Sequence, residues 1–134
     1  MKLNVFVAAH NVISSLGFTT DDNFENLKMG KTGIGLCNDK GLSQTPFYAS
    51  AIDTHKLDNA FKKLASPDKY TRFEKLLILS IDDALQKSKI DIKSKRTLLI
   101  ISTTKGNIDL FEEKKRHLFD SQRIHLWASA NEVK

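Results

Sequence analysis

Hydrophobic side chains at helical spacing are most regular between residues 70 and 88. They recur mainly three or four positions apart, which predicts an amphipathic helix with a wide apolar stripe. The flanking Ile78 and Leu79 widen the stripe and favour contact with more than one neighbouring element. The stripe itself consists of Phe73, Leu76, Leu77, Ile81, Ala84 and Leu85.

Two shorter helices are predicted upstream of this one. The first begins after Thr19 or Thr20, whose side-chain oxygens suit an N-cap, and it ends at Gly30. The second covers residues 53–64 and ends before Pro67, because proline disfavours a helical conformation at the residue that precedes it. The apolar side of this second helix is formed by Leu57, Phe61 and Leu64.

Two mostly apolar runs, residues 3–9 and 97–103, have the pattern of strands that are covered on both faces. Between the first two helices, residues 31–46 are rich in turn-forming residues and predict an irregular excursion with a short hairpin around residues 38–41. Residues 47–52 then form a short strand beside it.

A further amphipathic helix is predicted at about residues 108–119, after a loop that contains Gly106. Strands and helices therefore alternate along the chain, and this order favours the α/β fold class. Ser129 and Glu132 have the spacing of a capping box, which predicts the start of another helix. Because almost no chain follows Glu132, we expect the natural polypeptide to continue beyond Lys134.

Composition is that of a globular chain of 134 residues, of which 40% are hydrophobic and 28% charged. No apolar run approaches the roughly 20 residues that span a bilayer, so no membrane association is expected. The single cysteine, Cys37, cannot form an internal disulfide, which suits a reducing cytoplasm.

The formal charge of +5 is spread over basic clusters at residues 62–63, 93–96 and 114–116. Solvated charge beside helices and strands is the ordinary explanation for such clusters. A binding surface for an acidic protein is the alternative. Nucleic acid is not expected as a partner, because no interleaved aromatic residues and no recognisable module accompany the clusters.

The most informative motif is the sequence NVISSLG at residues 11–17, which follows the apolar run 3–9 and precedes the first helix. The loop GKTGI at residues 30–34 follows that helix. In order and spacing this resembles the opening of a β-ketoacyl-acyl-carrier-protein synthase. That family has a buried strand, a turn of the form Gly-Val-Val-Ser-Pro-Leu-Gly, a helix and a Gly-x-Ser-Gly-Ile loop. Asn11 stands where the family usually has Gly, and Ser15 where it often has Pro.

The resemblance extends over nearly the whole chain. Residues 70–73 correspond to the aromatic and basic end of a loop before the family's long helix, and residues 98–106 to its next buried strand and glycine-containing turn. Gly106 is the single glycine that this turn retains. The resemblance therefore makes residues 1–134 an N-terminal fragment of a β-ketoacyl synthase N-terminal domain.

The resemblance implies a truncated part of the thiolase-like α/β fold, with a mixed sheet and covering helices. It also implies the family's reaction, the decarboxylative condensation of an acyl thioester with malonyl-carrier protein in fatty-acid or polyketide synthesis. Acyl carrier protein is then the partner, and the full-length protein forms a homodimer or a heterodimer. No cofactor is implied. The family's nucleophilic Cys and its two catalytic His lie beyond Lys134, so the fragment alone is expected to be inactive.

No residue of this chain is predicted to be catalytic, cofactor-binding or metal-binding. Cys37 is interpreted as a structural or incidental thiol, because its position does not fit the family's nucleophile and no activating group is near in sequence.

A phosphate-binding P-loop at residues 30–33 is excluded by Glu25, which occupies the place of its first Gly. A dinucleotide fingerprint at residues 33–38 lacks its third Gly. The histidines are isolated from one another and form no metal-ligand spacing with Cys37; they are His10, His55, His117 and His125.

Two other functions remain open at this point. The chain belongs to a catalytically silent synthase-like subunit if the full-length protein lacks the nucleophilic Cys. It is instead a small basic α/β domain if it binds an acidic protein or a nucleic acid through its positive charge, in which case affinity falls steeply with salt and any polyanion binds.

Overall fold

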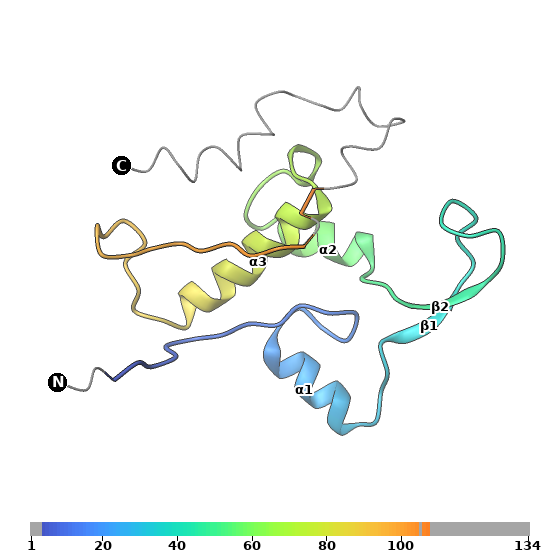
Figure 1. Ribbon diagram of the computed structural model, residues 1–134, viewed down its shortest axis with the longest axis horizontal. Coiled ribbons are helices and arrows are strands. Elements are labelled where there is room, and N and C mark those ends of the chain that lie inside the picture. The colour runs from blue at the N-terminus through green and yellow to red at the C-terminus, as the bar shows by residue number, and fades with distance from the viewer. Residues whose placement is uncertain (1–3, 105, 108–134) are drawn as a thin grey trace. The chain divides into compact units, whose positions relative to one another are not determined.

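The computed structural model describes residues 4–104 and 106–107, and the regular structure of these residues consists of helices and one hairpin (Figure 1). By its internal contacts the chain divides into two units, Met1–Leu99 and Ile100–Lys134. All elements of the described residues belong to the first unit. In chain order they are α1 (Thr20–Lys28), β1 (Ile34–Cys37), β2 (Phe47–Ser50), α2 (Thr54–Phe61), the 3₁₀-helix η1 (Pro67–Lys69) and α3 (Arg72–Gln86).

Helix α1 begins and ends where its sequence signals predict. Thr19 is the N-cap, and its Oγ1 accepts a hydrogen bond from the Asp22 amide at 3.1 Å. At the other end Gly30 has φ of +71°, a conformation that glycine adopts without steric penalty. The Gly30 amide donates to the Leu27 carbonyl at 2.9 Å and the Lys31 amide to the Asn26 carbonyl at 3.0 Å. This pair of bonds is a Schellman motif, which stops the helix.

A hairpin is present, but it is wider than the short one predicted around residues 38–41: β1 and β2 pair antiparallel, the strand predicted at residues 47–52 is its second strand, and residues 38–46 connect the two. Ile34 lies opposite Ser50 at one end of the pair and Cys37 opposite Phe47 at the other. In the connection the Asp39 carboxylate accepts from the Gly41 amide at 2.8 Å, which tightens the turn. The α/β class is therefore confirmed for the described residues, although their sheet is two-stranded and antiparallel and not the mixed sheet that we expected.

Helix α2 is shorter than predicted. Its N-cap is Asp53, whose carboxylate accepts from the Lys56 amide at 3.0 Å, but the helix ends at Phe61 and not at residue 64. The Phe61 carbonyl accepts from the amides of Leu64 at 2.9 Å and Ala65 at 3.1 Å, so the chain turns away at that point. Leu64 is consequently 41% exposed and does not extend the apolar side of α2.

Helices α2 and α3 pack against each other and enclose the core of the described residues. Leu57 and Phe61 on α2 are 0% exposed. The Phe61 ring meets the Tyr70 ring edge-on with 5.0 Å between centroids, a favourable aromatic geometry. Across the same pair of helices the Lys75 ammonium lies 2.6 Å from the Asp58 carboxylate. The core is thus small, apolar at its centre and closed by an ion pair.

The start of α3 is fixed by a capping box. Glu74 donates its amide to Thr71 Oγ1 at 3.1 Å, and its carboxylate accepts from the Thr71 amide at 2.9 Å. The neighbouring Arg72 guanidinium donates to Thr54 Oγ1 at 2.9 Å and to the Ile52 carbonyl at 2.6 Å, which ties the start of α3 to the start of α2.

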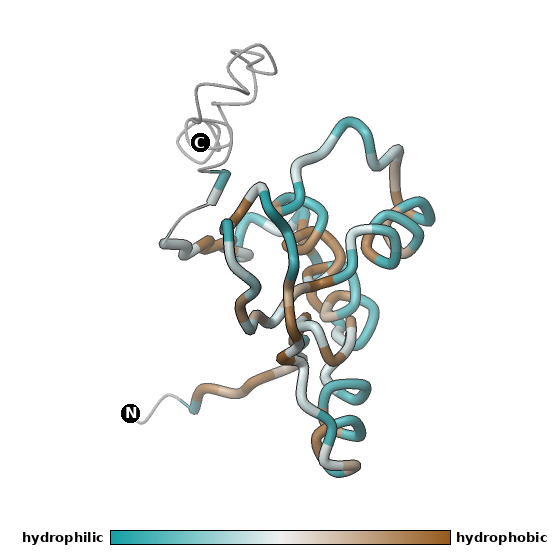
Figure 2. The backbone as a smooth tube through the Cα atoms, turned by 90° about the vertical axis from the view of Figure 1, so that its right-hand side faces the viewer, coloured by the Kyte–Doolittle hydropathy of each residue, from teal (hydrophilic) through white to brown (hydrophobic). Residues whose placement is uncertain are grey.

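The two apolar runs that were predicted as interior strands are not strands in this structure. Residues 4–9 and 97–103 carry no strand assignment, and Val5 is 93% and Leu99 67% exposed. Figure 2 shows the brown, hydrophobic colour along the N-terminal run. A strand requires a neighbour for its backbone groups, and the described strands β1 and β2 pair with each other. The predicted helix at 108–119 and the predicted capping box at 129–132 lie outside the described residues.

Candidate functional site

Reciprocal backbone hydrogen bonds close the turn at residues 14–17. The Ser14 amide donates to the Gly17 carbonyl at 2.9 Å, and the Gly17 amide donates back to the Ser14 carbonyl at 3.2 Å. Ser15 and Leu16 form the tip between these reciprocal bonds. The Leu16 amide donates to Ser14 Oγ at 3.0 Å. The motif is therefore a closed turn and not an open connection.

Asn23 on α1 joins this turn to the helix. It is 8% exposed, and its Nδ2 donates to the carbonyls of Val12 at 3.0 Å, Gly17 at 3.0 Å and Thr19 at 2.7 Å. Ser14 Oγ in turn donates to Asn23 Oδ1. The buried Asn23 side-chain amide thus bonds the Val12 carbonyl and adds a further hydrogen bond to the Gly17 and Thr19 carbonyls, which also accept from the backbone amides of Ser14 and Asn23. Losing these bonds in a buried position is costly.

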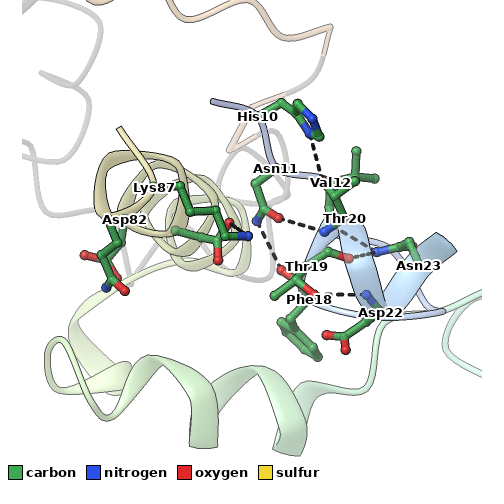
Figure 3. Close-up of polar contacts among 12 residues, drawn as sticks. His10, Asn11, Val12, Phe18, Thr19, Thr20, Asp22, Asn23, Asp82 and Lys87 are labelled. Carbon is green, nitrogen blue, oxygen red and sulfur yellow. Dashed lines mark hydrogen bonds and ion pairs between the residues drawn. The ribbon is translucent and has the colours of Figure 1, made fainter. Parts of the chain in front are cut away.

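Asn11 and Asn26 also form hydrogen bonds with the backbone of the segment between the turn and α1. Asn11 Oδ1 accepts from the Thr20 amide at 3.0 Å and Asn11 Nδ2 donates to the Phe18 carbonyl at 3.1 Å. Figure 3 shows the Asn11 side chain reaching the start of α1. Asn26 Nδ2 donates to the Leu16 carbonyl at 2.7 Å. The Asn11 side chain therefore supplies an acceptor to the Thr20 amide in the first turn of α1.

Two glycines of the motif segments lie where a side chain has no room. A Cβ at Gly17 would overlap the Cβ of Asp22, and one at Gly33 would overlap Ser15 Oγ. Ser15 Oγ lies 2.7 Å from Ser50 Oγ on β2. The loop at residues 30–34 therefore packs directly on the turn at residues 14–17, and both contact the hairpin.

An open hollow of about 350 Å³ is lined by residues 7–10, by Asp21 of α1 and by Lys87. Its polar groups are His10, Asp21 and Lys87, and its apolar groups belong to residues 7–9. His10 Nδ1 lies 3.2 Å from Thr20 Oγ1, so the ring is oriented by the start of α1. The hollow thus combines an apolar wall with one imidazole, one carboxylate and one ammonium.

Lys87 is the charged group of this hollow with a shifted pKa. Its ammonium lies 2.8 Å from the Asp83 carboxylate. The hydrogen bond to Asp83 raises the pKa of Lys87, burial opposes this shift, and the charges of Asp83, Asp21 and Asp22 reinforce it. The ammonium is therefore protonated near neutral pH, and this lysine is a cation there and not a nucleophile or a base.

The described candidate residues are not brought together. Cys37 lies at the end of β1 opposite Phe47, His55 on α2 and His10 at the hollow. Within residues 4–104 and 106–107, no group of three or more His, Cys, Asp or Glu side chains could hold a metal ion. His117 and His125 lie outside the described residues. The hollow thus has no thiol for nucleophilic chemistry, and the role of Cys37 as an incidental thiol stays a prediction.

Sequence reasoning missed the residues that organise the turn. Asn11 was noted as a departure from the family pattern, and Asn23 and Asn26 were not singled out. One sequence signal could have indicated this network: asparagines recur on both sides of the turn, and asparagine side chains commonly form hydrogen bonds with nearby backbone groups. Which carbonyls Asn23 reaches depends on how residues 12–19 fold, and no sequence pattern encodes that.

No family model, no curated protein and no solved structure matches the chain. Across the described part of the chain, no helix combines the length and the apolar character that crossing a membrane requires.

Proposed function

We propose that residues 1–134 form the N-terminal portion of a β-ketoacyl-acyl-carrier-protein synthase with a thiolase-like fold. Such an enzyme condenses an acyl thioester with malonyl-carrier protein, with loss of carbon dioxide, in fatty-acid or polyketide synthesis. Under this proposal the protein is cytoplasmic, uses acyl carrier protein as its partner and acts as a homodimer or heterodimer. The present residues serve to build the fold, and the nucleophile comes from chain beyond Lys134.

The contact between the two motif segments carries this proposal. The turn at residues 11–17 and the loop at residues 30–34 are the parts of the sequence that resemble the family. They meet through Gly33, which lies against Ser15, and α1 runs between them with defined caps at both ends. If the similarity of these short motifs arose by chance, there would be no reason for the two segments to pack together. There would also be no reason for their glycines, Gly17 and Gly33, to lie where a side chain does not fit.

The two uncovered apolar segments give further support. Residues 4–9 and 97–103 correspond to buried strands of the similar family, and their large hydrophobic side chains are exposed in this structure. Contiguous exposed apolar residues are unfavourable in water and normally meet a partner. Sheet-forming chain from the remainder of a synthase is the partner that this proposal supplies.

The proposal is tested by covalent labelling of the complete gene product. The protein is incubated with an acyl-carrier-protein thioester, and its intact mass is measured before and after treatment with hydroxylamine, which cleaves thioesters. We expect a hydroxylamine-sensitive acyl adduct on a cysteine beyond residue 134, because the family's reaction passes through an acyl-cysteine.

Two controls make the labelling experiment decisive. The Cys37→Ser variant should acquire the adduct as fast as the unchanged protein, and residues 1–134 alone should acquire none. Adduct formation at Cys37, or a gene that ends at Lys134, contradicts the proposal. A complete protein that has the fold but no cysteine at the nucleophile position identifies instead the catalytically silent subunit.

A further inference from the structure

The connection at residues 88–97, after α3, has a conformation fixed by its own hydrogen bonds. The Asp91 carboxylate accepts from the Lys93 amide at 2.9 Å, and the Asp91 carbonyl accepts from Thr97 Oγ1 at 2.6 Å and from the Ser94 amide at 3.2 Å. The Ser94 carbonyl also accepts from the Thr97 amide at 2.9 Å. These bonds define two consecutive turns, and we call residues 88–97 the basic loop.

The basic loop carries four exposed cations for which no acidic partner lies among the described residues. Lys89, Lys93, Lys95 and Arg96 are all exposed. In the described part of the chain the ion pairs join Lys28 to Glu25, Lys75 to Asp58 and Lys87 to Asp83, and none of them involves a cation of the loop. The one acid of the loop, Asp91, uses its carboxylate within the first turn. The loop therefore presents concentrated positive charge.

Two isoleucines interrupt this charge. Ile90 is 50% and Ile92 62% exposed, on either side of Asp91. β-branched aliphatic side chains on a preformed loop lose little conformational freedom when they are buried by a partner. Exposed aliphatic groups with cations next to them in the sequence, here Lys89 and Lys93, suit a protein interface, which has an apolar centre and a polar rim.

We propose that the basic loop is a docking site for an acidic protein surface whose carboxylates surround exposed apolar side chains. Charge complementarity selects the sign of the partner and accelerates the encounter. The isoleucines then supply the apolar contact. This site is separate from the turn at residues 11–17 and does not depend on the proposed synthase function.

A protein partner fits the loop better than a nucleic acid or a membrane. Proteins that bind single-stranded nucleic acids stack the bases on aromatic side chains, and residues 88–97 contain no aromatic residue. Insertion of both isoleucines into an anionic bilayer would push Asp91 towards the negative headgroups, which costs free energy. A folded partner can place a donor opposite Asp91 and carboxylates opposite the cations.

The test measures binding of the chain to a synthetic amphipathic helical peptide of Glu and Leu residues. Fluorescence anisotropy gives the dissociation constant at several salt concentrations. We expect the Lys93→Glu/Lys95→Glu/Arg96→Glu variant to bind at least about tenfold more weakly than the unchanged chain. Ile90→Ser/Ile92→Ser should also weaken binding, but with an unchanged dependence on salt, because the charges remain.

The matched control is Lys40→Glu/Lys62→Glu/Lys63→Glu, which makes the same change in net charge at exposed lysines elsewhere. This control should retain most of the affinity, and circular dichroism should be the same for all variants. Equal loss in the control assigns the binding to net charge and overturns the proposal. The absence of peptide binding overturns it as well, as does tighter loop-dependent binding to phosphatidylserine vesicles or to single-stranded DNA.

Discussion

Gly33 and Gly35 occupy neighbouring positions in very different surroundings. A Cβ at Gly33 would overlap Ser15 Oγ, whereas a Cβ at Gly35 meets nothing within 4 Å. The Ser15 hydroxyl is held 2.7 Å from Ser50 Oγ, so it cannot move without loss of that contact. The identity of residue 33 is therefore dictated by packing, and that of residue 35 is not.

We expect Gly33→Ala to destabilise the chain by about 1–3 kcal/mol, the usual cost of forcing a group into an occupied space. Gly35→Ala adds the same methyl group in open space on β1, where alanine restricts the unfolded chain more than glycine does, so this variant should be neutral or slightly stabilising. Urea unfolding of both variants measures the difference. Equal midpoints for the two variants would show that the turn and the loop at residues 30–34 do not pack as described.

At the scale of single elements, the helix pair α2–α3 depends on two fully buried side chains of α2. Leu57 is 0% exposed, whereas Leu64, in the turn that follows the helix, is 41% exposed. Leu57→Ala should cost about 2–5 kcal/mol through lost burial and a residual cavity, and Leu64→Ala should cost clearly less. Thermal unfolding followed by circular dichroism compares the two identical chemical changes. A larger effect at Leu64 would contradict the assignment of the core.

The N-cap of α2 predicts a specific dependence on acid. The hydrogen bond from the Lys56 amide lowers the pKa of Asp53 below its usual 3.8, with burial opposing and the His55 amide assisting. A carboxyl group with a lowered folded-state pKa stabilises the fold above the unfolded-state pKa, and this contribution is lost as the pH falls through the folded-state pKa. The cap should therefore be intact at pH 5 and above.

The Asp53→Asn variant separates this effect from the titration of other acids. Asparagine keeps an N-cap acceptor but does not ionise, so the unfolding free energy of this variant should fall less steeply than that of the unchanged chain as the pH is lowered below about 4. Urea unfolding at a series of pH values gives the two slopes. Parallel slopes would mean that the Asp53 carboxylate contributes nothing at this cap.

Helix ends were readable from the sequence because their signals are local. Thr19 and Gly30 predicted the bounds of α1. The stripe predicted α3 over residues 70–88, two residues too long at each end, and the Thr71–Glu74 capping box that fixes its start has a spacing that a sequence reveals. The end of α2 was predicted too late, because Leu64 fits the helical spacing but the chain turns at Phe61. Strand formation at residues 97–103 was wrong for this structure, because apolar character cannot specify whether a pairing neighbour exists.

At the scale of the whole molecule, the small buried core contrasts with long uncovered apolar segments. Among the described residues the buried hydrophobic core consists of Leu57 and Phe61, while Leu98, Leu99 and Ile100 are exposed. Net stability is a small difference between large terms, so a core of this size leaves little margin. The proposed synthase resolves the contrast, because a larger sheet would take up residues 4–9 and 97–103 as strands.

Amide hydrogen exchange at residues 97–103, measured in this chain alone and in the complete gene product, shows whether these residues become an interior strand of a larger sheet. Backbone amides without a pairing strand exchange rapidly, and those in an interior strand exchange only on opening of the sheet. We expect rapid exchange in the chain of residues 1–134 and strong protection in the complete protein. Protection already present in the chain alone, or rapid exchange in both, would contradict the proposal that these residues form an interior strand of a synthase.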